Sequence, residues 1–148
     1  MAADVLIDGC LAALAEQTGL GRLLLDEHGC CSFEHSDGFA FTLMAPEAGD
    51  LVHLSSALMD VPAQGRESFY SRLLRLNFLL LETSGATLSI DEEEQGVFLC
   101  LALVRAQWSA ERLLVVMANF LASSSRLRQR LLNGEEVAGR PDTGWIAG

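Results

Sequence analysis

The sequence contains no lysine, and its ten arginines are outnumbered by twenty aspartates and glutamates. The formal net charge is therefore -10 at pH 7. This shortage of positive charge argues against nucleic acids and anionic membrane surfaces as partners, because their phosphates repel an acidic protein. We expect instead that a partner of this chain presents a basic polypeptide segment.

Long apolar runs are also missing from the chain. The longest ones, such as residues 78–81 and 97–104, are far too short to span a bilayer. The N-terminus has no basic region, and Asp4 and Asp8 interrupt its apolar residues, which argues against a secretory signal peptide. We therefore expect a cytoplasmic protein without membrane insertion, in which the four cysteines are reduced thiols.

Motifs that carry chemistry are scarce as well. Gly9, Gly19 and Gly21 do not form a phosphate-binding or dinucleotide-binding fingerprint after a strand, and no nucleophile elbow is present. The acidic run at residues 91–94 lacks the alternation and the glycine of a calcium loop, which favours a solvated hairpin tip. The sequence thus predicts no catalytic residue and no cofactor, and it favours a binding protein over an enzyme.

One cluster of side chains could still bind a metal or act as a nucleophile, namely His28, Cys30, Cys31 and His35. Zinc needs four ligands that converge on one point, whereas adjacent cysteines in a strand point to opposite faces. A reactive cysteine needs positive surroundings, which an acidic segment does not supply. We expect no metal site here, and a small thiol or zinc enzyme built on these four residues is the alternative from a different functional class.

Hydrophobic periodicity predicts three helices and two groups of strands. Apolar residues recur at helical spacing in residues 3–18, 67–81 and 109–132, and Ser109 can cap the last helix. Shorter runs bounded by turn residues predict strands, while residues 51–58 fit either a strand or an irregular segment. The predicted strands are residues 23–25, 30–33, 39–44, 86–90 and 97–104.

The resulting order is α-βββ-α-ββ-α, which indicates a single α+β domain with an antiparallel sheet flanked by helices. This domain covers residues 1–133, and a polar, glycine-containing tail at residues 134–148 is expected to be mobile. Charge is uneven along the chain, because residues 1–65 hold one arginine against ten acids whereas residues 66–148 hold nine arginines against ten acids. The acidic field therefore belongs to the N-terminal half.

The second predicted helix has more apolar surface than one core contact requires. Two apolar stripes run side by side along it, which indicates burial on two sides and suggests self-association. The first stripe consists of Phe69, Leu73, Leu76 and Leu80, and the second of Tyr70, Leu74, Phe78 and Leu81.

Together these patterns resemble the class I type III secretion chaperones, the Tir-chaperone-like family of small, acidic, cytoplasmic bacterial proteins with the same order of elements. The matching segments are residues 20–29 (LGRLLLDEHG), 73–80 (LLRLNFLL), 85–103 (GATLSIDEEEQGVFLCLAL) and the last helix. The resemblance covers nearly the whole predicted domain. Its most specific part is the LNF near the end of the second helix, followed by GATLSID.

The resemblance implies a homodimer formed largely through the second helix and a neighbouring strand. It also implies a partner, the N-terminal segment of a secreted effector, bound in extended form so that the effector stays soluble and competent for secretion. Exposed apolar grooves and free sheet edges would accept such a segment. Family members do not hydrolyse ATP themselves, and the ATPase of the secretion apparatus is a further expected partner.

On this basis we expect two binding surfaces. The groove for the effector is assigned to Leu11, Leu14, Leu23, Leu25, Phe33 and Phe41. The dimer interface is assigned to Phe69, Leu73, Leu76, Asn77 and Leu80. Each single groove residue fits plain core as an alternative, and Asn77 could bond locally instead of across the interface. A regulatory partner-switch protein of the same fold, which controls secretion gene expression, is a further alternative that the sequence leaves open.

Overall fold

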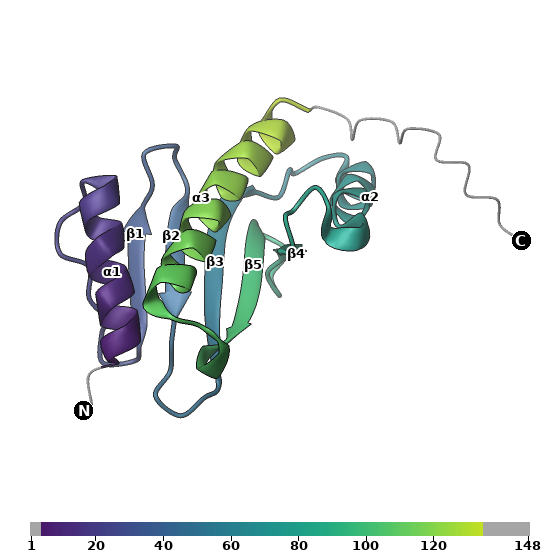
Figure 1. Cartoon of the computed structure of the whole chain (residues 1–148). Helices are drawn as coiled ribbons and strands as arrows, with labels where there is room; N and C mark the ends of the chain where they lie inside the picture. Colours follow the sequence, from purple (N-terminus) through teal and green to yellow (C-terminus); the bar gives the residue numbers. More distant parts are fainter. Residues whose placement is uncertain (1–3, 135–148) are drawn as a thin grey trace, which may run out of the picture.

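The computed structural model describes residues 4–134, and its elements follow the predicted order (Figure 1). They are α1 (Val5–Thr18), β1 (Cys30–Glu34), β2 (Ala40–Met44), β3 (Leu51–Asp60), α2 (Arg66–Leu76), β4 (Thr87–Ile90), β5 (Gly96–Val104) and α3 (Ala110–Leu132). Single-turn 3-10 helices, η1 (Phe78–Leu80) and η2 (Arg105–Gln107), follow α2 and β5. The predicted α+β class is thereby confirmed. The predicted mobile tail, residues 134–148, lies outside the described residues except for Gly134.

The five strands form one antiparallel sheet in the order β1-β2-β3-β5-β4. The central strand is β3, which covers the segment that fitted either a strand or an irregular structure. Buried and part-exposed residues alternate along it, so that Val52, Leu54, Ser56 and Leu58 face the core. This alternation gives the sheet one apolar face that needs a cover.

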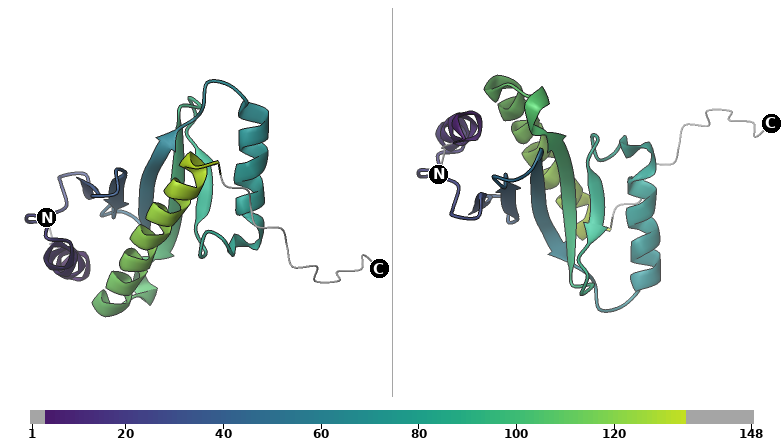
Figure 2. Two further views of the ribbon diagram at one scale, coloured as in Figure 1. Left: turned by 90° about the horizontal axis from the view of Figure 1, so that it is seen from above. Right: turned by 90° about the horizontal axis from the view of Figure 1, so that it is seen from below.

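The helices α1 and α3 cover that face, and α2 lies at the side of the sheet (Figure 2). The α3 helix packs across β3, and α1 packs beside α3. The α2 helix instead contacts the outer strand β4, at the end of the sheet opposite α1. Within residues 4–134, no helix covers the other face of the sheet, and no helix is long and apolar enough to cross a membrane.

The ends of the helices follow from local capping. The Asp4 carboxylate accepts the N–H of Ile7 at the start of α1, and Ser109 accepts the N–H of Arg112 at the start of α3 as predicted. Gly19 ends α1 with a left-handed backbone, at a φ of 69°, which costs glycine no steric strain.

The predicted strand at residues 23–25 is wrong, because the structure has no strand there. One backbone hydrogen bond, from the N–H of Asp26 to the C=O of Cys30, ties Asp26 to the start of β1, but the chain before Asp26 forms no ladder with β1. Gly29 allows the turn between them, since a Cβ atom there would lie 2.6 Å from the carbonyl oxygen of Ala45. The third strand ahead of α2 is β3 instead, which is why the predicted order still holds.

The second helix ends earlier than predicted, at Leu76 instead of residue 81. Leu79 and Leu80 adopt left-handed backbone angles, with φ of 54° and 57°, through which an α-helix cannot continue. The turn places Asn77 against β4, where its side chain bonds to the backbone of Leu88. Apolar spacing missed this end because contacts with β4, not periodicity, set the backbone here.

The C-terminal end of α3 is bonded to α2 and to the loop after η1. Arg72 of α2 donates to the carbonyl oxygens of Arg130 and Leu131. Arg130 forms an ion pair of 2.6 Å with Glu82, and Arg126 donates to the carbonyl oxygen of Glu82 at 3.1 Å. These arginines therefore hold α2 and its loop in place, in addition to any interaction with the helix dipole.

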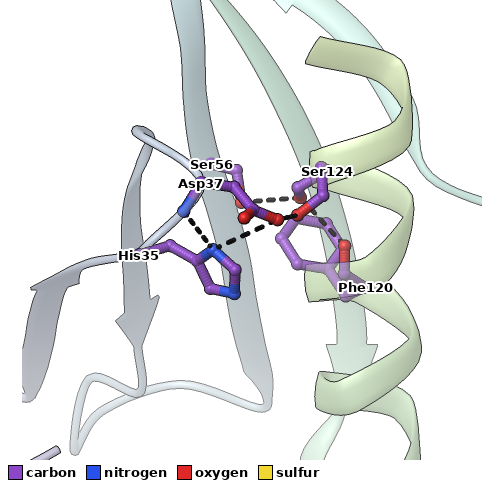
Figure 3. A network of polar contacts seen from close by, with 6 residues as sticks. His35, Asp37, Ser56, Phe120 and Ser124 are labelled. Atoms are coloured by element: carbon purple, nitrogen blue, oxygen red, sulfur yellow. Dashed lines mark hydrogen bonds and ion pairs between the residues drawn. The ribbon is translucent and has the colours of Figure 1, made fainter. Parts of the chain in front are cut away.

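A set of polar contacts joins α3 to the sheet and to the β1–β2 turn (Figure 3). The hydroxyl oxygens of Ser56 on β3 and Ser124 on α3 are 2.8 Å apart, and both residues are buried. In the turn, Asp37 accepts a hydrogen bond of 2.5 Å from Ser125 and donates its backbone N–H to Nδ1 of His35 at 3.1 Å. These contacts fix the position of the β1–β2 hairpin relative to α3.

Candidate partner-binding surfaces

The outer edge of β4 has no partner strand among the described residues, and the outward groups of Leu88, one of its two outward-facing residues, are occupied. In an antiparallel ladder, every second residue turns its N–H and C=O away from the paired strand. The Asn77 carboxamide accepts from the N–H of Leu88 at 2.8 Å and donates to its C=O at 2.9 Å. Just before β4, the Thr83 carbonyl accepts from the N–H of Ala86 at 3.2 Å, and its hydroxyl donates to the C=O of Ala86 at 2.5 Å. Within β4, the outward groups of Ile90 are therefore left for an added strand, whereas those of Leu88 are not.

The outer edge of β1 is occupied only at its start. The ladder to β2 turns the backbone groups of Cys30, Ser32 and Glu34 outward. At Cys30 both groups are taken, because the Asp26 carboxylate accepts its N–H at 2.9 Å and the Asp26 N–H donates to its C=O at 2.8 Å. No described residue bonds to the outward groups of Ser32 and Glu34, and both residues are exposed. Of the two sheet edges in the described part of the chain, β1 is therefore the more open.

A group of exposed apolar side chains lies where α2 ends, and we name it the α2-end cluster. Leu74, Leu79 and Leu81 are 71%, 68% and 75% exposed, which is unusual for leucine. Soluble proteins rarely expose neighbouring apolar side chains of this kind unless they form an interaction site. The cluster consists of Leu74, Phe78, Leu79, Leu80 and Leu81.

The structure separates the residues predicted for the dimer interface. Phe69, Leu73 and Leu76 are buried in the core of their own chain. The Asn77 carboxamide bonds to β4 of the same chain, and Leu80 is partly exposed within the α2-end cluster. The exposed apolar surface belongs mainly to the second stripe of the predicted helix. Periodicity reveals both stripes, but the position of β4 decides which one faces the core.

The residues predicted for the effector groove also fall into two sets. One set belongs to the core and has no surface that a partner could reach, whereas the other is partly exposed and packs against the rim of the core. The buried residues are Leu11, Leu14 and Phe41, and the partly exposed ones are Leu23, Leu25 and Phe33. The second set comes from β1 and from the connection that precedes it, so it lies on the same side of the molecule as the open edge.

An acidic cavity of about 500 Å³ lies between the start of α1, the turn before β1 and η2. Its one arginine, Arg105, is already paired with Asp4 at 3.5 Å. A lining of this charge suits a basic side chain better than an anion. The acidic residues that line it are Asp4, Asp8, Asp26, Glu27 and Glu47.

The predicted cluster of cysteines and histidines is spread over separate environments. Within residues 4–134, no three Cys, His, Asp or Glu side chains converge in a way that could hold a metal ion. Cys31 is buried, which raises the pKa of its thiol, whereas Cys30 lies on the opposite face of β1. His28 is exposed, and the ring of His35 stacks on that of Phe39 with centroids 4.5 Å apart.

Solved structures share this fold. A chain of the ExsC–ExsE complex superposes with a TM-score of 0.68 at 23% identity, covering 84% of this chain and 92% of that one. A chain of the HopA1–SchA chaperone–effector complex gives a TM-score of 0.65 at 19% identity, with 87% and 94% covered. The heterodimeric ExoU–SpcU complex from the type III secretion system of Pseudomonas aeruginosa gives 0.62 at 17% identity, with 86% and 95% covered. At these identities the likeness establishes the fold.

A comparison with curated proteins gives no match. The sequence model of the Tir chaperone protein (CesT) family, in contrast, matches residues 9–128, which run from within α1 to within α3. The chain therefore belongs to the Tir chaperone protein (CesT) family.

Proposed function

We propose that this chain is a cytoplasmic type III secretion chaperone, which binds the N-terminal segment of a cognate effector in extended form and keeps that effector soluble and competent for secretion. The family match over residues 9–128 carries the proposal. The similar structures support it, since their names describe a chaperone–effector complex and a complex from a type III secretion system.

The open edge of β1 offers a physical basis for binding an extended segment. The outward backbone groups of Ser32 and Glu34 can pair with an incoming strand, whose main-chain hydrogen bonds provide affinity for many sequences. Leu25 and Phe33 are partly exposed and lie on the same side of the molecule. Apolar side chains of the segment can pack on them, which adds preference for particular residues.

The charge of the N-terminal half supports a basic segment as the partner. Residues 1–65 hold ten acids and one arginine, and five of these acids line the cavity beside the start of β1. An arginine or lysine of the effector segment would meet a favourable potential there. Attraction of this kind raises the association rate and weakens at high salt.

We infer that a second copy of the chain covers the α2-end cluster. The cluster is apolar and lies within the half of the chain that is nearly neutral, with nine arginines against ten acids in residues 66–148. Two copies that met through their acidic N-terminal halves would repel each other. The C-terminal half, in contrast, combines a low net charge with the exposed leucines of the cluster. The homodimer would therefore form through the end of α2 and leave both β1 edges available.

Copurification from secreting and non-secreting bacteria tests the proposed function. A tagged chain should retain one secreted protein through that protein's N-terminal segment, and deletion of the chain should lower the solubility and secretion of the same protein. A chain that purifies without any secreted protein, and whose deletion changes no secretion, would contradict the proposal. Exchange of the effector for a regulatory protein when secretion stops would indicate the partner-switch function instead.

A further inference from the structure

The two outer edges of the sheet are closed to different degrees, and the closing groups are side chains and backbone of neighbouring segments. At β4, Asn77 and Thr83 together make four hydrogen bonds to the outward groups of Leu88 and Ala86. At β1, Asp26 makes two hydrogen bonds to Cys30, and the next outward position, Ser32, is open. At both edges, therefore, the backbone groups are occupied by specific hydrogen bonds at defined positions.

Two hydrogen bonds hold the Asp26 carboxylate in the position where it occupies the outward N–H of Cys30. One oxygen of its carboxylate accepts the N–H groups of both Cys30 and His28, at 2.9 and 2.8 Å. These hydrogen bonds lower the pKa of Asp26, with the bond from Cys30 as the largest cause, so the carboxylate is charged at neutral pH. An incoming strand would have to displace a charged acceptor to reach Cys30, and hydrogen bonds to charged groups are the stronger ones.

The length of an added ladder follows from where these contacts stop it. A strand that pairs with β1 can use the outward groups of Ser32 and Glu34, but its ladder must end before Cys30. The occupied position at Cys30 therefore limits how far along β1 an added strand can pair.

We propose that Asp26 limits the ladder of the bound effector segment to Ser32 and Glu34 by occupying the edge of β1 at Cys30, while Asn77 occupies the edge of β4 at Leu88. The inference rests on the proposed function and specifies where on β1 the segment pairs. The segment then pairs with Ser32 and Glu34 only. Cross-strand preference favours a basic or polar residue opposite Glu34 and apolar residues on the face shared with Phe33.

Residue-resolved amide hydrogen exchange by NMR tests this arrangement, with the wild-type protein free and bound to a peptide of the N-terminal segment of the copurifying secreted protein. In the free protein, the amides of Ser32 and Glu34 should exchange fast and that of Leu88 slowly. Peptide binding should slow exchange at Ser32 and Glu34 by about tenfold or more and leave Leu88 unchanged.

Asp26→Ala and Asp26→Asn form a matched pair for the role of the carboxylate at Cys30. Alanine removes the acceptor of the Cys30 N–H but keeps the backbone bond from residue 26 to the Cys30 carbonyl. The Cys30 amide should therefore exchange fast in the free variant and become protected when a carbonyl oxygen of the bound peptide accepts it. The asparagine side chain keeps an acceptor oxygen and should preserve the wild-type pattern. If Cys30 stays unprotected in the Asp26→Ala complex, or if both variants behave like the wild type, the limiting role of Asp26 is overturned.

Asn77→Ala tests the closure of β4 without any partner. Loss of the carboxamide should speed exchange at Leu88 and promote association of the sheets at this edge, which is detectable as a rise in sedimentation coefficient. Thr83→Val, which removes only the hydroxyl bond to Ala86, serves if Asn77→Ala does not fold. Protection at Leu88 that Asn77→Ala does not weaken, or a sedimentation coefficient that neither variant raises, would overturn the closure of β4. A wild-type protein that never binds the peptide would instead overturn the proposed function, and the limiting role of Asp26 with it.

Discussion

Ser56 on β3 and Ser124 on α3 form a buried hydroxyl pair, with oxygens 2.8 Å apart, that bonds the covering helix to the central strand. The Ser124 hydroxyl oxygen also lies 2.9 Å from the carbonyl oxygen of Phe120, which can accept its single proton if Ser56 is replaced. Within residues 4–134, the side chain of Ser56 has no such second bond. We predict that Ser124→Ala lowers the free energy of unfolding by about 1–3 kcal/mol and Ser56→Ala by less, because an unpaired buried hydroxyl is costly.

Urea denaturation of both single variants and the double variant measures this coupling. The double variant should lose less stability than the two single variants combined, since it leaves no hydroxyl unpaired. Strictly additive losses would show that the two hydroxyls do not interact.

Substitutions in the α2-end cluster should dissociate the dimer without unfolding the chain. Leu74→Glu or Leu81→Glu places a charge on a side chain that is 71% or 75% exposed in the single chain. Such a charge costs little in the monomer but is strongly unfavourable in an apolar interface. Light scattering after size exclusion should show a dimer for the wild type and a monomer for either variant, with unchanged circular dichroism.

Two controls separate this effect from a general loss of stability. Val115→Glu adds the same charge to an exposed residue of α3, 59% exposed, and should leave the dimer intact. Leu76→Glu changes a residue of the predicted interface that is 1% exposed, and it should unfold the chain. Dissociation by Val115→Glu, or a folded monomer from Leu76→Glu, would argue against the α2-end cluster as the interface.

The two sets of predicted groove residues should respond differently to truncation. Leu11→Ala empties core volume and should cost about 2–5 kcal/mol of stability. Leu24→Ala serves as a control outside the predicted groove, because this neighbour of Leu23 and Leu25 is 52% exposed, and it should change stability by less than about 0.5 kcal/mol. Phe33→Ala should reduce the free energy of binding the effector peptide by more than it reduces the free energy of unfolding. Titration calorimetry measures the first quantity and scanning calorimetry the second. Equal affinity of Phe33→Ala and wild type would remove Phe33 from the binding surface.

The buried cysteines should make stability depend on pH in the alkaline range. Burial raises the pKa of Cys10 and Cys31 above the ordinary value of 9.0. Below that value both the folded and the unfolded chain hold the thiol protons. Above it, the unfolded chain loses its protons first, so the free energy of unfolding should fall as pH rises.

Urea denaturation between pH 8 and 10.5 measures this loss, and the Cys10→Ala/Cys31→Ala variant should show a flatter profile. Iodoacetamide at pH 8 should modify the more exposed Cys30 before either buried thiol. Modification of Cys10 or Cys31 ahead of Cys30 would contradict the burial described above.

Much of the fold could be predicted from local patterns. Turn residues and alternation located β2 and β5, and Ser109 marked the start of α3, because these signals act within a few residues. The strand predicted at residues 23–25 failed since a short leucine run fits a strand and a core-packing loop equally well. The end of α2 failed because Asn77 bonds to β4, which is a contact between separate elements.

The candidate site could be predicted less well, for a related reason. Apolar periodicity reports that Leu73 and Leu74 are both suited to burial, but it cannot tell that Leu73 faces the core and Leu74 faces solvent. The open positions of β1 depend on backbone groups, which every residue carries. Asp26 gave a signal only as a turn residue, and its role at Cys30 appears once the register of β1 is known.

Native mass spectrometry of the protein purified from secreting bacteria tests the central claim most directly. We expect a complex of two copies of the 16.0 kDa chain with one secreted protein. That protein should remain attached after proteolysis only through an N-terminal segment. A stable wild-type monomer that carries no secreted protein, and that does not bind one when it is supplied, would contradict the account.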